Sequence, residues 1–167
     1  LVPAVLDRPM NSKEALGARH NVGGGPTVDA VVAHLDHVLS SALAASLFPS
    51  VLKQLFTQVF YDIGVALFNE MVIRSSYNAS QAVQIKLEVS NFDNWLQNVS
   101  NDVKENLRGI SHGLNVVKET CNLLFVDKVA FLSKEFLAET CPSLNGKQVK
   151  TLLTKFVPDD ICPEKTP

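Results

Sequence analysis

Apolar residues recur at steps of three and four along most of the chain, from about Thr27 to Asp160. This spacing places them on one side of an α-helix, which has about 3.6 residues per turn. No segment alternates apolar and polar residues for long, and no Asn-Gly or Asp-Gly turn separates two β-branched runs. The pattern therefore predicts an all-α fold, a multi-helix bundle of about six helices that is part of a larger helical domain.

The first two predicted helices meet at Phe48-Pro49. Thr27 can cap the first helix, and Pro49, which lacks an N–H, suits the first turn of the second, which runs to about Arg74. The expected stripe of the first helix is Val28, Val31, Val32, Leu35, Val38, Leu39 and Leu43. Apolar residues surround most of the second helix, and such a helix is usually enclosed by others. We therefore predict that the helix from Val51 to Val72 is the centre of the domain.

Four more helices are expected after the polar loop 75–80. One spans about 79–99, and its expected buried members are Val83, Leu87, Phe92, Trp95, Leu96 and Val99. Asp102 and Glu105 have the spacing of a capping box, which predicts a single helix from there to about Leu124. A short helix is expected near 129–139. A last helix begins near Ser143 or Asn145 and carries Val149, Leu152, Leu153 and Phe156.

The ends of the chain have a different composition. Prolines and glycines, including the run Gly23-Gly24-Gly25, punctuate residues 1–26, where at most one short helix fits, around Asn11–Ala18. The triple glycine lacks the Gly-Lys-Ser/Thr of a phosphate loop, so a flexible linker is favoured. The predicted organisation is a flexible segment at 1–26, a helical domain at 27–160 and a tail at 161–167.

Composition argues against several classes of protein. A net charge of −2 gives no electrostatic footprint for nucleic acid or an anionic membrane. No run of eighteen or more apolar residues is present, so we expect no membrane insertion. Charged residues make up only 19% of the chain, so some apolar surface is expected to meet a partner or a missing part of the domain. Since the chain begins with Leu1 and shows no signal peptide, we interpret it as a fragment.

The residues that could carry chemistry do not form a catalytic constellation. His34 and His37 share a helix face, as two metal ligands would, but no third ligand is evident and a solvated face is favoured. Three cysteines without metal spacing favour a reducing compartment, and Cys121 and Cys141 are interpreted as structural. The pair Asp159-Asp160 is expected to be solvated. We therefore predict no enzyme, no cofactor and no metal.

Two further features have both a structural and a functional interpretation. Trp95, the only tryptophan, is expected to pack in the core with its indole N–H bonded locally. The last helix has a partly basic outer surface, formed by Lys147, Lys150 and Lys155. Such charges usually keep a face solvated, and the alternative is a docking surface for a partner.

Four motifs in order, over about residues 50–160, resemble the dilute (DIL) domain. A Lys-Gln-Leu-Phe-like helix runs into an Asn-centred apolar run with a basic end, an aromatic-acidic-Trp-Leu run follows, and a Cys-Pro-Ser-Leu element precedes a Gln-Val helix and a turn. In this chain the first motif is Lys53-Gln54-Leu55-Phe56 with Asn69 and Arg74, and the second is Phe92-Asp93-Asn94-Trp95-Leu96. The third is Cys141-Pro142-Ser143-Leu144 with Gln148-Val149, and the fourth is the turn Val157-Pro158-Asp159-Asp160.

The resemblance implies a non-catalytic interaction domain in the cytoplasm, associated with the cytoskeleton or vesicles. In class V and XI myosins such a domain is the globular tail, which binds cargo adaptors and Rab-type GTPases and folds back on the motor. Motor tails carry a basic cluster that serves autoinhibition, and this chain keeps only Lys128 there, which counts against inhibition of a motor by this route. We expect Lys128, Lys147, Lys150 and Lys155 to be the partner-binding candidates. The alternative is a motor-less Ras/Rap effector or cell-junction scaffold.

Overall fold

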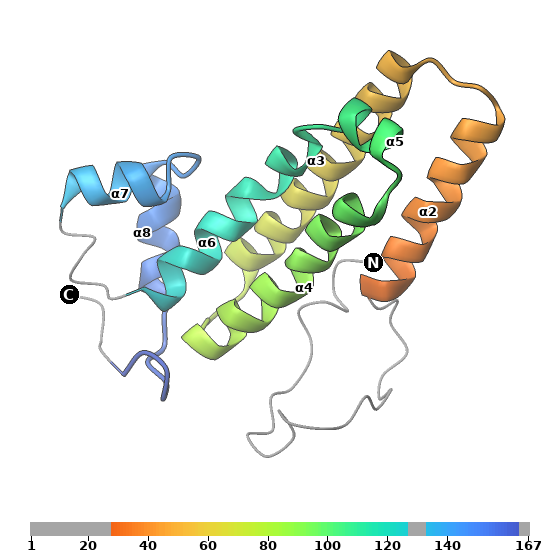
Figure 1. Ribbon diagram of the computed structural model, residues 1–167. Coiled ribbons are helices and arrows are strands. Elements are labelled where there is room, and N and C mark those ends of the chain that lie inside the picture. Colours follow the sequence, from red (N-terminus) through yellow and green to blue (C-terminus); the bar gives the residue numbers. More distant parts are fainter. Residues whose placement is uncertain (1–27, 127–132, 164–167) are drawn as a thin grey trace.

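The computed structural model describes residues 28–126 and 133–163 as a bundle of seven α-helices and one 3-10 helix without strands (Figure 1). The elements are α2 (Val28–Ala44), α3 (Pro49–Ile73), α4 (Ala79–Asn98), α5 (Asn101–Asn106), η1 (Ile110–Leu114), α6 (Asn115–Phe125), α7 (Lys134–Thr140) and α8 (Gly146–Thr154). The all-α prediction is confirmed. The predicted flexible segment 1–26, its short helix and the Thr27 cap lie outside the described residues.

Three long segments form the body of the bundle. In Figure 1, α3, α4 and the η1–α6 segment run side by side, and α3 packs most closely against η1 while α4 packs against α6. Helix α2 lies against α4 at one edge, and α8 packs against α6 at the opposite end of the molecule. The last two helices are therefore held to the bundle mainly through α6.

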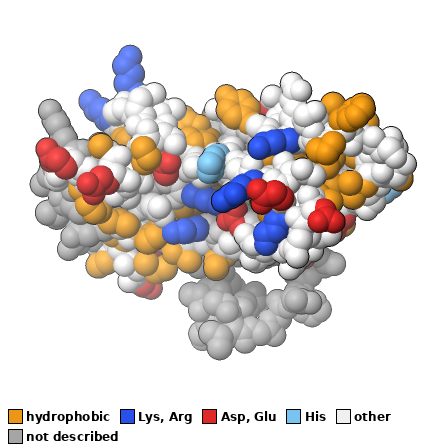
Figure 2. All heavy atoms as spheres, turned by 45° about the horizontal axis from the view of Figure 1, so that its top comes forward, with side chains coloured by type: hydrophobic (Ala, Val, Ile, Leu, Met, Phe, Trp, Pro, Cys, Tyr) orange, Lys and Arg blue, Asp and Glu red, His pale blue; other side chains and the backbone are white. Residues whose placement is uncertain are grey.

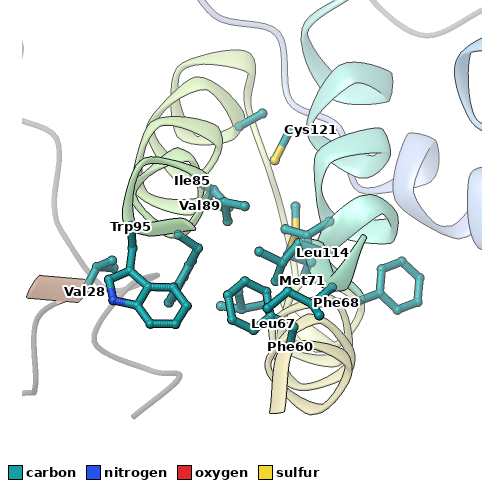
Figure 3. Close-up of a cluster of buried hydrophobic side chains, with 14 of the residues drawn as sticks. Val28, Phe60, Leu67, Phe68, Met71, Ile85, Val89, Trp95, Leu114 and Cys121 are labelled. Atoms are coloured by element: carbon teal, nitrogen blue, oxygen red, sulfur yellow. The ribbon is translucent and has the colours of Figure 1, made fainter. Parts of the chain in front are cut away.

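Helix α3 supplies the aromatic centre of the core. Pro49 occupies its first turn, as predicted. The rings of Phe56 and Phe60 lie 5.6 and 6.0 Å from the ring of Trp95, and Phe60 also meets the edge of Phe92 at 6.0 Å. Figure 3 shows Phe60 and Trp95 among buried residues contributed by α4, η1 and α6. The prediction that α3 is central is confirmed for this side of the helix.

The opposite side of α3 is not enclosed by the described residues. Val51 is 47% exposed, Leu55 38% and Ile73 73%. The prediction that neighbouring helices cover most of α3 is therefore wrong within the part of the chain that the structure describes. An apolar pattern reports what a side chain prefers, whereas its burial depends on whether another element is present to cover it.

A pair of glycines sets the distance between α3 and η1. A β-carbon added at Gly64 would lie 2.0 Å from the carbonyl oxygen of Gly113, and one at Gly113 would lie 2.6 Å from the backbone nitrogen of Tyr61. Backbones this close leave no room for a side chain at either position. The glycines therefore allow the backbones of α3 and η1 to approach each other this closely.

The same region corrects the prediction of one helix from Asp102 to Leu124. The chain forms α5, then a turn in which Gly109 adopts a φ of 86°, then η1 and α6. The predicted capping box is absent, since Ser100 is the N-cap of α5 and makes no side-chain cap bond. Capping boxes instead start α4, at Asn78 and Gln81, and α8, at Asn145 and Gln148.

Helix α4 buries a different face from the one predicted. Phe92 and Trp95 are buried as expected, but Leu87 is 64% exposed. The buried positions of its first half are Ala82, Ile85 and Val89. The predicted Val83 and Leu87 are four residues apart, as are Ile85 and Val89, so each pair by itself has helical spacing. Contact with α6 decides between them, because Ile85 and Val89 join the same buried cluster as Val117 and Cys121.

Among the described helices, α3 also has the length and apolar composition of a membrane-spanning helix. The core helix of a water-soluble domain passes the same test. Its buried side packs against Trp95, Phe92 and Leu114, which are residues of the bundle. We therefore treat α3 as a core helix.

Candidate partner-binding surface

The outer side of α8 carries the basic residues that the sequence singled out. Lys147 and Lys150 are exposed, one helical turn apart on the same side. The neighbouring threonine hydroxyls bond back to the helix, Thr151 Oγ1 to the carbonyl of Lys147 at 2.9 Å and Thr154 Oγ1 to that of Lys150 at 2.7 Å. The two ammonium groups are thus the main polar groups offered by this side of α8.

Lys155 and Lys128 do not join this pair. The half-buried Lys155 donates from Nζ to the backbone carbonyl of Val72, near the C-terminal end of α3. A cation at this end of a helix satisfies an unpaired carbonyl and the negative end of the helix dipole. Its ammonium group therefore links α8 to α3, whereas Lys128 lies outside the described residues.

An apolar cleft lies just before α8 in the chain. It has a volume of about 330 Å³ and is lined by Leu137 and Ala138 of α7 and by Cys141, Pro142 and Leu144 of the following turn. The residue after Leu144 is Asn145, the N-cap of α8. An apolar cleft and exposed lysines therefore occur on consecutive parts of one segment, a combination suited to an amphipathic peptide with acidic residues.

A buried carboxylate holds the turn between α7 and α8. Glu119 of α6 accepts hydrogen bonds at 2.7 Å from both the backbone N–H and the hydroxyl of Ser143. The thiol of Cys141 also lies 3.6 Å from the carbonyl oxygen of Glu119. Because Val149 and Leu152 are buried on the inner side of α8, its two lysines are left facing outward.

The segment after α8 is tied back to the bundle. Tyr77 donates from its N–H to the carbonyl of Lys155 at 2.9 Å, and its own carbonyl accepts from Val157 at 2.6 Å. Asp159 then accepts from the N–H and the hydroxyl of Ser80, at 2.7 and 2.6 Å, in the first turn of α4. The expectation that Asp159 is solvated is therefore wrong, whereas Asp160 is exposed.

The other carboxylate oxygen of Asp159 accepts from the N–H groups of Cys162 and Ile161, at 2.9 and 3.2 Å. Partial burial by itself would raise the pKa of Asp159, but the hydrogen bonds from Ser80, Cys162 and Ile161 outweigh that effect. The net result is a pKa below the ordinary value for aspartate. Cys162 is buried, so this part of the predicted tail packs on the domain.

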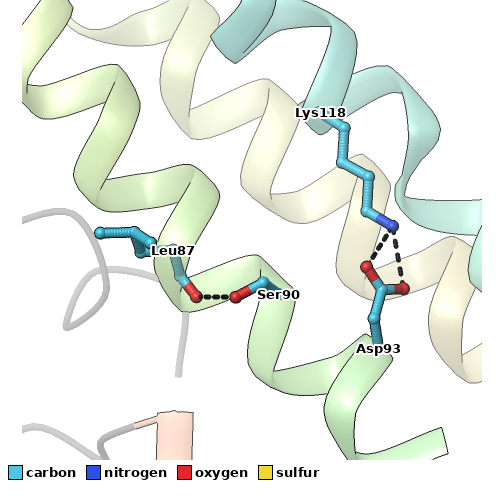
Figure 4. Close-up of polar contacts among 4 residues, drawn as sticks. All are labelled: Leu87, Ser90, Asp93 and Lys118. Atoms are coloured by element: carbon cyan, nitrogen blue, oxygen red, sulfur yellow. Dashed lines mark hydrogen bonds and ion pairs between the residues drawn. The ribbon is translucent and has the colours of Figure 1, made fainter. Parts of the chain in front are cut away.

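Polar contacts also join α4 to α6 (Figure 4). Lys118 Nζ lies 2.9 and 2.6 Å from the two carboxylate oxygens of Asp93. On a neighbouring turn Lys86 donates to Asn122 at 2.7 Å and lies 4.7 Å from the ring centre of Phe125. These lysines are occupied within the molecule, unlike Lys147 and Lys150, for which the described residues show no ion pair.

The sequence matches the DIL domain over residues 54–160, which is more than half of the chain and includes α8, the cleft and Asp159. The chain belongs to the DIL domain family. Its relatives include the myosin-H heavy chain of Dictyostelium discoideum, 32% identical over 64% of this chain, and unconventional myosin-Va of Gallus gallus, 26% identical over 81%. The chain covers 6 and 7% of the lengths of these two relatives.

Solved structures agree with this assignment of the fold. The structure of Myo2-GTD in complex with Mmr1 matches with a TM-score of 0.73 and 18% identity, over 84% of this chain and 35% of that chain. The structure of Myo2-GTD in complex with Smy1 matches with the same TM-score and 17% identity, over 88% and 37%. The DIL domain described above thus corresponds to about a third of each Myo2-GTD chain.

The tryptophan of this DIL domain has a structural role. Trp95 is buried, and its indole N–H donates to Asp36 of α2 at 2.5 Å. Core packing is therefore confirmed, but the N–H partner lies 59 residues away rather than nearby in the sequence. A polar cleft of about 360 Å³ between α2 and α4 includes both residues, together with Asp29, Val32, Asn91, Asn94, Asn98 and Val99.

The histidines and cysteines of the DIL domain show no arrangement for chemistry. His34 and His37 are exposed on α2, and the described residues contain no group of three ligands that could hold a metal ion. Burial raises the pKa of Cys121 to about 12 and that of Cys141 to about 11. Both thiols stay protonated at neutral pH, so neither is an activated nucleophile.

Two functional features were missed in the sequence. Glu119 was passed over because it lies two residues after Val117 and two before Cys121, on another side of the helix from the predicted apolar stripe. In the fold it is buried against the turn that contains Ser143, which no local pattern indicates. No sequence pattern predicted the cleft formed by α7 and the turn after it, because the cleft depends on the angle between these two segments.

Proposed function

We propose that this DIL domain is a non-catalytic, cytoplasmic interaction domain that links a myosin to cargo adaptors or Rab-type GTPases. Family membership carries the proposal, together with the solved structures of Myo2-GTD in complex with Mmr1 and with Smy1. The relatives named above are myosins, which favours a motor tail over a motor-less scaffold. The domain is expected to act on the cytoskeleton or on vesicles.

We further propose that partners bind the surface formed by the apolar cleft and by Lys147 and Lys150. The cleft offers an anchor site for one apolar side chain, and the two ammonium groups favour an acidic partner segment. Exposed charges of this kind raise association rates and weaken as salt increases. Lys155 contributes less, because its ammonium group is engaged with Val72. Lys128 remains a candidate from the sequence alone.

The test is affinity capture from cytosol, followed by direct binding measurements with each purified protein recovered. We expect adaptors or Rab-type GTPases, and a loss of affinity of about tenfold or more for the double variant Lys147→Glu and Lys150→Glu. Lys53→Glu is the matched control, since Lys53 is exposed on α3. Capture of neither class by folded protein would refute the function. Equal affinity for the double variant would refute only the site.

A further inference from the structure

The polar cleft between α2 and α4 is lined by two rows of hydrogen-bonding side chains. Asp29 and Asp36 are seven residues apart on the N-terminal half of α2, so they lie on the same side of that helix. The α4 wall contributes three asparagines at steps of three and four, which also share one side of their helix. They are Asn91, Asn94 and Asn98. The cleft therefore has carboxylates on one wall and carboxamides on the other.

Most of these groups are not used by the fold. One side-chain hydrogen bond crosses the cleft in the part of the chain that the structure describes, from the indole N–H of Trp95 to Oδ1 of Asp36. Polar groups enclosed between packed helices are almost always hydrogen-bonded. Here the carboxylate of Asp29 and the amides of Asn94 and Asn98 are exposed and have no side-chain partner among the described residues. They are open to another molecule.

The cleft also carries negative charge that no neighbouring cation balances. None of its eight described lining residues is Lys, Arg or His, and neither Asp29 nor Asp36 forms an ion pair with a described residue. By contrast, Asp93 of α4 is paired with Lys118. On the face in Figure 2, Lys and Arg side chains lie over the middle of the molecule and at the end formed by α7 and α8, and none is visible where α2 meets α3.

The distribution of acceptors favours a guanidinium group over an ammonium group. Guanidinium presents five N–H donors in one plane and has no acceptor, so it can bond to carboxylate and amide oxygens on both walls. Val32 and Trp95 offer apolar surface for the methylene groups of an arginine side chain. The volume of about 360 Å³ lies at the lower end of the range for ligand pockets. It therefore suits a side chain rather than a folded element.

We propose that the cleft between α2 and α4 binds arginine side chains from a basic segment of a partner protein. Asp29 and Asp36 are separated by about 10 Å along the axis of α2, a distance that three residues of an extended chain also span. A segment with arginines three positions apart can therefore reach both carboxylates, since Oδ2 of Asp36 is not used by Trp95. This site is separate from the surface at Lys147 and Lys150 and takes a partner segment of opposite charge.

The test is a titration of the 167-residue chain with the peptide Arg-Gly-Gly-Arg, capped at both ends. Trp95 is the only tryptophan, so its indole N–H signal in proton–nitrogen NMR spectra reports on the cleft directly. We expect a saturable shift of this signal and an affinity about tenfold higher than that of the same peptide with citrulline in place of arginine. Citrulline keeps the shape of arginine but lacks its charge. Asp29→Asn should lower the affinity about threefold or more.

Asp102→Asn is the matched control. Both aspartates are exposed in the first turn of a helix, so either variant removes the same favourable charge from a helix N-terminus, but only Asp29 lines the cleft. No saturable shift at millimolar peptide, equal affinity for the citrulline peptide, or equal loss in the two variants would overturn the proposal. A shift of the Trp95 signal by Arg19→Gln without peptide would overturn it in favour of the chain's own preceding residues. Slower sedimentation of Asp29→Asn than of the wild type would do so in favour of a second copy.

Discussion

At the scale of single residues, this domain depends on polar groups that are paired across long stretches of sequence. Glu119 holds Ser143, Asp159 holds Ser80, and Trp95 donates to Asp36. The described residues contain one buried side-chain polar atom without a partner, the hydroxyl of Tyr77. Burial raises the pKa of this hydroxyl, so it stays neutral and keeps a proton that it cannot donate.

The Tyr77 hydroxyl provides a prediction of increased stability. An unsatisfied buried polar group is unfavourable by about 1–3 kcal/mol. Phenylalanine at position 77 would keep the aromatic ring that packs there and remove the hydroxyl. Tyr77→Phe should therefore increase the free energy of unfolding by roughly 1 kcal/mol in urea denaturation. Tyr61→Phe is the control, since Tyr61 is 56% exposed. A less stable Tyr77→Phe protein would mean that the hydroxyl has a partner in solution.

Asp159 provides a prediction of pH dependence. Its pKa in the folded state is lowered, so the stability it contributes is complete above the unfolded pKa of about 3.9 and is lost as pH falls through the folded value. The difference in unfolding free energy between the wild type and Asp159→Asn should therefore be largest near neutral pH and shrink below about pH 4. Thermal melts followed by circular dichroism from pH 7 to pH 2.5 measure this difference.

Asp160→Asn is the control for this experiment, because Asp160 is exposed beside the same turn. It should show little difference from the wild type at any pH. A constant difference for Asp159→Asn across the whole range would contradict the assignment, since it would mean that the charge of Asp159 does not matter.

Core residues of α3 and surface residues of α8 should respond differently to truncation. Phe60 and Leu67 are buried, so replacing either with Ala should destabilise the domain by roughly 2–5 kcal/mol. Lys150 is exposed, and Lys150→Ala should stay within about 0.5 kcal/mol. Chemical denaturation measures both classes of variant. Equal losses would show that the assignment of buried and exposed faces is incorrect.

At the scale of secondary-structure elements, the contact between α3 and η1 is the least tolerant of change. Gly64 and Gly113 allow the two backbones to meet at distances that exclude any side chain. The neighbouring atoms are backbone atoms, which cannot move aside as a flexible side chain can. The position of η1, and therefore the direction in which α6 leaves it, depends on this pair.

Gly113→Ala should strongly destabilise the domain. The added β-carbon would lie 2.6 Å from the backbone nitrogen of Tyr61, so η1 must shift away from α3. We expect a loss of about 2 kcal/mol or more, in the range seen for overpacked cores. Gly146→Ala is the control, because a β-carbon there meets nothing within 4 Å. Equal stability of the two variants, measured by thermal unfolding, would contradict the close contact.

At the scale of the whole molecule, the two ends of the bundle differ in chemistry. The end formed by α2 and α3 is apolar and almost free of charge, whereas α7 and α8 present a cleft and two exposed lysines. Our proposal for adaptor binding concerns the second of these surfaces. The second surface depends on α6, because α8 is held through Glu119 and through its packing against α6.

Removing Glu119 should loosen this end more than the rest of the bundle. Glu119→Ala leaves the N–H of Ser143 without its acceptor, so amide hydrogen exchange should increase in α8 while α4 stays protected. Glu139→Ala is the control, since Glu139 is exposed on α7. Equal increases in both helices would mean that Glu119 supports the whole fold rather than the attachment of α8.

Local pattern determined the helical class, the start of α3 at Pro49 and a start of α8 near Ser143 or Asn145. These features depend on residues within a few turns of one another, and such information is present in any short window of sequence. The resemblance carried by motifs such as Phe92–Leu96 also identified the family correctly.

Tertiary structure decided the remainder. Leu87 faces outward because α6 packs on the other apolar face of α4. The predicted helix from Asp102 divides at Gly109, and η1 then packs closely against α3 at Gly113. Asp159 bonds to Ser80, 79 positions earlier. A helical repeat shows that a side of a helix is apolar, but it does not show which element covers it. That depends on the relative positions of segments distant in sequence, which form together only in the folded chain.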